Sequence, residues 1–184
     1  MSQYFQYFGV LKALDSINKK RKIEGLDIPE RDGKAGLLWH TQGSGKSFSM
    51  VMLAQRLITN QIYNNPTIVV LTDRNDLDEQ LFTTFSNSRE YLRTTPVKVE
   101  SREDLINKLS NIKQGGIFFT TIQKFDKSNI VPNDRSNIIV MADEAHRGHY
   151  GIFEKLSYQK DEEGDYELVA KYGVEKYIRD SLPN

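Results

Sequence analysis

The sequence contains no cysteine, which excludes a disulfide framework and metal sites built from thiolates. The absence of disulfides fits the cytosol, where thiols stay reduced. Neither sign of charge is in excess, because 25 Lys and Arg residues balance 25 Asp and Glu residues. Bulk charge therefore neither indicates nor excludes a nucleic-acid partner, and any such contact must be local.

Long apolar runs are also missing. No run approaches the roughly 18 residues that a membrane-spanning helix needs, and the N-terminal residues are polar and aromatic rather than those of a signal peptide. We therefore expect no membrane segment. With 38% hydrophobic and 27% charged residues, the composition is that of a globular protein, and 184 residues suit one domain. We expect residues 1–184 to form that single domain.

The stretch from Trp39 to Ser47, WHTQGSGKS, has the pattern of a phosphate-binding loop. A short apolar run at 35–39 predicts a strand before it, and the spacing of apolar residues at 48–58 predicts a helix after it. Glycines let backbone N–H groups turn inward onto an anion, and the N-terminus of the helix adds partial positive charge. Lys46 would reach the phosphates, and Ser47 would offer its hydroxyl to Mg²⁺.

Apolar runs alternate with helical patterns along the rest of the chain, which predicts a parallel sheet with helices on both faces. Ser101 and Asp104 have the spacing of a helix cap, as do Asp76 and Glu79. The further strands are expected at 67–71, 97–99, 117–120 and 137–142, and the further helices at 2–22, after Asp76, after Ser101 and at 166–181.

Asp143 and Glu144 directly follow the last expected strand. Ligands of such sheets bind beyond the carboxyl ends of the strands, where a carboxylate can hold Mg²⁺, usually through water. Asp143 is the Mg²⁺ candidate, and Glu144 is placed to orient or deprotonate a water that attacks the γ-phosphorus. An isolated Asp-Glu pair would more often begin an ordinary helix, but together with the phosphate loop it predicts nucleotide hydrolysis. His146 fits either a relay of nucleotide state or a structural hydrogen bond, and His149 has no assigned role.

Four stretches together resemble the motor subunit (R subunit) of type I restriction enzymes: GLLWHTQGSGKS, VVLTDRNDLDEQ, FFTTIQKF and ADEAHRGHYG. The resemblance covers about Gln3 to Asn184, within the first RecA-like domain of superfamily 2 helicases and translocases. His40 departs from the usual loop pattern, which has Gly or Ala there, but it is typical of this family. The resemblance implies a three-layer RecA-like P-loop NTPase with a mainly parallel sheet, ATP and Mg²⁺ as cofactors, and double-stranded DNA and the methylation (M) and specificity (S) subunits as partners.

The resemblance also assigns roles to single residues. Gln6 would read the adenine edge, although an exposed helical glutamine is a nearly equal alternative. Two motifs would contact the DNA backbone. The first consists of Thr72, Asp73 and Arg74, and the second of Thr120, Thr121 and Gln123. For both, a solvated turn is the alternative. The expected catalytic residues are Lys46, Asp143 and Glu144, and the expected metal ligands are Ser47 and Asp143. The expected nucleotide contacts are Gln6, Thr41, Gly43, Ser44, Gly45, Lys46 and Ser47. The expected DNA contacts are Arg74, Thr120, Thr121 and Gln123.

The family pattern also includes parts that do not occur in these 184 residues, namely a nuclease domain and a second RecA-like domain with an arginine finger. An arginine finger is worth about 10³–10⁵ in rate, so we expect weak hydrolysis by this chain alone. Two alternatives remain at this point. One is the corresponding domain of another superfamily 2 DNA or RNA helicase, and the other is a catalytically silent nucleotide-binding domain.

Overall fold

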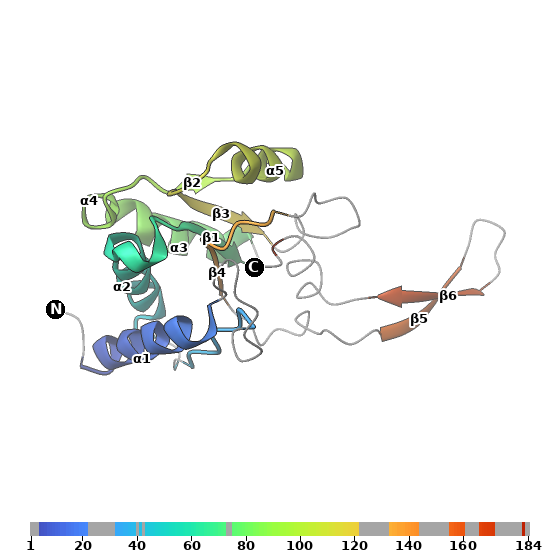
Figure 1. Ribbon diagram of the computed structural model, residues 1–184. Helices are drawn as coiled ribbons and strands as arrows, with labels where there is room; N and C mark the ends of the chain where they lie inside the picture. Colours follow the sequence, from blue (N-terminus) through green and yellow to red (C-terminus); the bar gives the residue numbers. More distant parts are fainter. Residues whose placement is uncertain are drawn as a thin grey trace.

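The computed structural model describes residues 4–21, 32–39, 41, 43–72, 75–121, 133–143, 155–160, 166–171 and 182. Its centre is a four-stranded sheet with the order β2-β3-β1-β4, in which every pairing is parallel (Figure 1). The strands are β1 (Thr67–Thr72), β2 (Val97–Lys98), β3 (Ile117–Thr121) and β4 (Ile138–Ala142). All four predicted strands in this part of the chain are thus confirmed, within a residue or two at their ends.

Helices cover both faces of this sheet. Elements on the α2 face and the α5 face bury separate apolar clusters against the strands, which confirms the predicted three-layer α/β architecture of a RecA-like domain. No helix in the described part of the chain is long and apolar enough to cross a membrane. The helices are α1 (Tyr4–Lys20), α2 (Lys46–Thr59), the 3-10 helix η1 (Gln61–Tyr63), α3 (Asn75–Asn87), α4 (Arg89–Leu92) and α5 (Arg102–Asn111).

Strand β1 lies between β3 and β4, and all six of its residues are buried. Its side chains alternate between the two cores, because successive residues of a strand point to opposite faces. Ile68 and Val70 pack in the core on the α2 side, whereas Val69 and Leu71 pack in the core on the α5 side. A strand covered on both faces needs a continuous apolar run, which is why the run at 67–71 predicted it correctly.

The start of α5 follows the predicted capping pattern. The Ser101 hydroxyl accepts a hydrogen bond from the backbone N–H of Asp104 at 3.1 Å, and the Asp104 carboxylate accepts one from the N–H of Glu100, also at 3.1 Å. Two N–H groups near the start of the helix are thereby satisfied by side chains. For α3, the backbone confirms a helix from Asn75, but the predicted cap at Asp76 lies outside the described side chains.

The predicted strand at 35–39 is wrong: residues 34–39 form no regular element. Gly36 has a φ of 114°, which is incompatible with a regular strand, and the segment lies along α1 instead of pairing with the sheet. The Ser16 hydroxyl of α1 donates to the carbonyl of Ala35, and a Cβ added at Gly9 would meet Leu38 at 3.5 Å. The contacts of this run with α1 thus involve Ala35 and Leu38, whereas Leu37 and Trp39 are 71% and 73% exposed. An apolar run on its own does not show that its side chains are buried in a sheet.

The predicted helix at 166–181 is also wrong in its first part. Tyr166–Lys171 is a strand, β6, which pairs antiparallel with β5 (Lys155–Lys160) in a separate two-stranded sheet. The sequence signal for β5 is the period-two pattern of Leu156 and Tyr158 between polar residues, and the register places these two opposite Ala170 and Leu168. Residues 172–181 lie outside the described part of the chain.

Candidate functional site

The predicted phosphate loop leads directly into α2. Gly43 and Gly45 have φ values of 77° and 80°, a left-handed conformation in which glycine is strongly favoured. Gly45 is the N-cap of α2, with no side-chain cap and no acidic residue in the first helical turn. The positive end of the helix is thus not neutralised by a carboxylate of its own first turn, as an anion site requires.

A turn closed by Ser44 precedes this helix. The backbone N–H of Ser44 donates to the carbonyl of Thr41 at 3.2 Å, and the Ser44 hydroxyl donates to the same carbonyl at 2.6 Å. These bonds hold Ser44 against Thr41 just ahead of Lys46. His40 and Gln42, which belong to the same stretch, lie outside the described residues.

The structure brings Lys46 and Asp143 together. Lys46 is the first residue of α2, Asp143 follows β4, and Lys46 Nζ lies 2.5 Å from Asp143 Oδ1. The backbone N–H of Asp143 donates to the carbonyl of Leu71 at 2.8 Å, which extends the β1–β4 ladder by one residue and fixes the carboxylate at the edge of the sheet. The Asp143 side chain is 11% exposed and that of Lys46 35% exposed. Two residues about a hundred positions apart in the sequence therefore form one ion pair at the edge of the sheet, and their roles in a nucleotide site stay predictions.

Gln6 of α1 contacts the loop backbone. Its side-chain Nε2 donates to the carbonyls of Ser44 and Gly45, both at 3.1 Å. The residue is 6% exposed, so the alternative of an exposed helical glutamine is wrong. The structure thus gives Gln6 a contact that sequence reasoning missed, and its adenine-reading role stays a prediction. In the sequence, the only indication that Gln6 has a role at the loop was the family resemblance, in which a glutamine lies upstream of the phosphate loop.

The carboxyl ends of three strands carry polar side chains. In the register of the sheet, Thr72 of β1 pairs with Thr121 of β3, and Asp143 follows the position in β4 that pairs with Leu71. Thr72 and Thr121 are 1% and 8% exposed. Because paired residues of parallel strands share a face, Thr121, Thr72 and Asp143 form a row at the edge of the sheet that faces α2.

Thr120 lies on the other face, in register with Leu71, and is 1% exposed. Within the described residues, the buried hydroxyl oxygens of Thr72 and Thr120 have no hydrogen-bond partner. The DNA contacts of Thr120 and Thr121 stay predictions. Arg74, Gln123, Glu144, His146 and His149 lie outside the described part of the chain.

The donors at this edge fit a Mg²⁺-nucleotide. In the described residues, no group of three or more His, Cys, Asp or Glu side chains gathers to hold a metal on its own. Mg²⁺ does not need such a cage, since it is commonly bound by one or two protein oxygens together with phosphates and retained waters. Asp143 is an oxygen donor available for it, and the unpartnered hydroxyl of Thr72 lies in the same row. Ser47, which follows Lys46 in α2, stays the predicted second donor.

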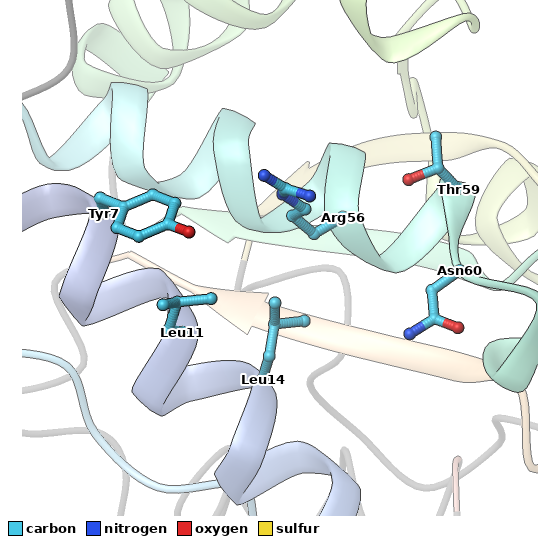
Figure 2. Close-up of a pocket in the computed structure, with 6 residues that line it drawn as sticks. All are labelled: Tyr7, Leu11, Leu14, Arg56, Thr59 and Asn60. Carbon is cyan, nitrogen blue, oxygen red and sulfur yellow. The ribbon is translucent and has the colours of Figure 1, made fainter.

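A groove of about 360 Å³ runs between α1 and α2 (Figure 2). Tyr7, Leu11 and Leu14 of α1 line one side of it. The other side consists of Arg56, Thr59 and Asn60, which form the C-terminal end of α2. These α2 residues lie at the opposite end of the helix from Lys46, so the groove is not the proposed phosphate site.

Comparison with known proteins gives a consistent pattern. A family model described as SWI2/SNF2 ATPase matches residues 5–184. The type I restriction enzyme HindI endonuclease subunit of Haemophilus influenzae is 44% identical to this chain over 189 aligned residues. The alignment covers the whole of this chain and 16% of the relative. The putative type I restriction enzyme MjaIXP endonuclease subunit of Methanocaldococcus jannaschii is 41% identical to this chain over 156 residues. That alignment covers 82% of this chain and 14% of the relative. The chain thus spans 16% or less of the length of these two relatives. No solved structure matches it.

Proposed function

This chain belongs to the SWI2/SNF2 ATPase family, in the branch represented by type I restriction endonuclease subunits, and we propose that it binds Mg²⁺-ATP where α2 meets β4. The observation that carries the proposal is the 2.5 Å contact between Lys46 Nζ and Asp143 Oδ1. It joins the lysine of the phosphate loop to a carboxylate at the carboxyl edge of a parallel sheet, where nucleotides bind in this class of fold. Each of the two residues alone would be compatible with many structures.

The chain's own residues would divide the work as follows. The glycine turn and the N-terminus of α2 bind phosphate oxygens, and Lys46 moves from Asp143 to the β- and γ-phosphates. Asp143 and Ser47 then hold Mg²⁺, which supplies neutralisation of the phosphate charge when bound. Glu144, next to Asp143 in sequence, orients the attacking water and accepts its proton. On nucleotide binding, the ion pair between Lys46 and Asp143 would thus be replaced by two new contacts. Lys46 would contact the phosphates, and Asp143 would contact Mg²⁺.

We also propose the larger context of this domain. Residues 1–184 form one RecA-like domain of a longer subunit, whose second RecA-like domain supplies an arginine finger and whose nuclease domain cuts the DNA. ATP hydrolysis in the intact subunit drives translocation of double-stranded DNA, in a complex with the M and S subunits. The names of the relatives and the small share of their length that this chain covers support this assignment.

Binding of a fluorescent ATP analogue to this chain tests the proposal. Lys46→Ala removes the cation that would meet the phosphates and should abolish binding, whereas Lys12→Ala, which removes an exposed lysine of α1, should leave the affinity unchanged. Equal binding by Lys46→Ala and the parent would show that the site is misassigned. In the full-length subunit, stimulation of ATP hydrolysis by double-stranded DNA but not by RNA would separate a DNA motor from an RNA helicase.

A further inference from the structure

The two edge strands of the four-stranded sheet, β2 and β4, are built differently (Figure 1). Strand β2 is only two residues long, Pro96 precedes it, and it carries Lys98. Short length, proline and lysine are features by which natural proteins keep a sheet edge from pairing further. Strand β4 has none of them, since its sequence over Ile138–Ala142 is Ile-Ile-Val-Met-Ala. An apolar edge strand without such protection is a template for one more strand.

Half of the backbone groups of β4 point away from its neighbour β1. The carbonyl of Asn137 and the N–H of Asp143, which flank β4, both bond to β1, at 2.9 Å and 2.8 Å. Because alternate residues of a strand turn their N–H and carbonyl groups to the same neighbour, the odd-numbered residues of β4 face β1. The residues that face the other way are Ile138, Val140 and Ala142. Among the described residues, no strand pairs with β4 on that side.

The connections between the strands show in which direction the chain moves across the sheet. Connections between parallel strands are right-handed in about 98% of cases, so those that cross one face all move the same way. Over the α5 face the chain moves towards β4, because α5 leads from β2 to β3. The connection from β3 to β4 follows this rule, since the Asn133 side chain donates to the carbonyl of Leu109 in α5 at 2.8 Å. Over the opposite face, α3 and α4 lead from β1 back to β2.

Leu182 lies on the α5 face of the sheet. It packs against the apolar cluster on that side, to which Val140 of β4 also belongs. The stretch 143–181 that separates Leu182 from β4 is far longer than the roughly dozen residues that a crossover between parallel strands needs. A strand that follows Leu182 therefore joins the sheet beyond β4, whereas a place beyond β2 would require a left-handed crossover.

We propose that the outer edge of β4 is a docking site for a parallel strand from the segment that follows residue 184 in the longer subunit. This inference rests on the larger context proposed above, and the chain spans 16% or less of the length of its two relatives. The outward backbone groups of Ile138, Val140 and Ala142 then bond to the added strand, as those of the odd-numbered residues bond to β1. The carboxyl end of the added strand lies next to Asp143, so the same segment borders the proposed nucleotide site.

Amide hydrogen exchange of this chain and of the full-length subunit, both without nucleotide, tests the inference. Mass spectrometry with fragmentation reads the exchange at single amides. The N–H groups of Ile138, Val140 and Ala142 should exchange rapidly in this chain and at least about a hundredfold more slowly in the subunit, where they are paired. The N–H groups of Ile139 and Met141 bond to β1 and should be protected in both proteins, which makes them the matched control.

A chain that continues past residue 184 into the following strand, but lacks any segment before residue 1, should gain the same protection. The inference is overturned if the three outer amides exchange equally in all these proteins, or if their protection requires a segment that precedes residue 1. Protection already present in this chain would show that its own residues or a second copy cover the edge, and would overturn it too.

New protection at Lys98 of β2 instead of at β4 would place the added strand at the opposite edge and overturn the inference as well. Failure of this chain to bind an ATP analogue would overturn the proposed nucleotide site. It would leave the exchange rates, and with them this inference, unaffected.

Discussion

Lys46 and Asp143 are bonded to each other across the edge of the sheet, with Lys46 Nζ 2.5 Å from Asp143 Oδ1. Each side chain thus satisfies the other at the position where phosphate and Mg²⁺ would separate them. The Coulomb energy of such a pair is partly screened, because the Lys46 side chain is 35% exposed. Nucleotide binding must therefore compete with an existing ion pair, and weakening this pair should change phosphate and metal binding in different directions.

The substitution Asp143→Asn keeps the shape of the side chain and removes its charge. Lys46 then no longer has to break its contact with a charged Asp143, so the affinity for a nucleotide triphosphate in EDTA should equal or exceed that of the parent. The additional affinity gained with Mg²⁺ should disappear, since Asp143 would be the protein's charged oxygen donor to the metal. Titrations with and without Mg²⁺ measure both effects. A retained Mg²⁺ gain in Asp143→Asn would contradict the metal assignment, and Lys46→Ala serves as the control that binds under neither condition.

Gln6→Ala should destabilise the chain and weaken nucleotide binding through the loop. It removes two hydrogen bonds to the carbonyls of Ser44 and Gly45, each worth about 0.5–1.5 kcal/mol, so a loss of about 1–3 kcal/mol in the free energy of unfolding is expected. Denaturant unfolding measures the stability, and competition with ATP and GTP measures the affinity. If Gln6 only holds the loop, both nucleotides lose affinity equally. If it also reads adenine, ATP loses more than GTP does.

Gly45→Ala should be damaging for two separable reasons. The left-handed φ of 80° costs a non-glycine residue about 1–2 kcal/mol, and the added Cβ would collide with Nε2 of Gln6. Truncating Gln6 removes the collision but not the backbone strain. The double variant Gln6→Ala with Gly45→Ala should therefore be less destabilised than the sum of the two single variants. Additive losses in a denaturation series would indicate that the glutamine amide can move aside without cost.

The sequence was sufficient for the layers of the fold and for the sheet edge at which Lys46 meets Asp143. Continuous β-branched runs such as Thr67–Thr72 have few alternatives to a buried parallel strand, and two of them end next to polar residues with metal-binding chemistry. It was insufficient where an apolar segment had two possible partners. The run at 35–39 does not join the sheet: Gly36 adopts a positive φ, and Ser16 of α1 bonds to the carbonyl of Ala35, while the side chains of Leu37 and Trp39 stay exposed.

The contacts within the candidate site were less predictable than the strands that border it. The contact of Gln6 with the loop depends on how α1 packs against α2, which is a tertiary arrangement that no local pattern encodes. The unpartnered hydroxyl of Thr72 is likewise visible only once the neighbours of β1 are known. In the sequence, this threonine is simply the polar end of an apolar run.

The stability of the chain should fall at alkaline pH through Tyr63. Burial raises the pKa of the Tyr63 hydroxyl above its usual value of 10.0, and the nearby Arg21 guanidinium opposes this more weakly. The hydroxyl also donates to Asn18 Oδ1 at 2.7 Å, a bond that the ionised form cannot make. Because the pKa is higher in the folded than in the unfolded state, the contribution of this group is complete below about pH 10 and is lost as the pH rises through the folded pKa.

Tyr63→Phe provides the comparison for this effect. At pH 8 the variant should be less stable than the parent by about 0.5–1.5 kcal/mol, because it lacks the hydrogen bond to Asn18. Above pH 10 the difference should shrink, since the parent loses the same bond when Tyr63 ionises, whereas phenylalanine has no proton to lose. Urea denaturation of both proteins at pH 8 and near pH 10.5 isolates this change from the other tyrosines and lysines, which titrate in both proteins alike. A stability difference that stays constant across this range would show that Tyr63 ionises with the same pKa in the folded and unfolded chain.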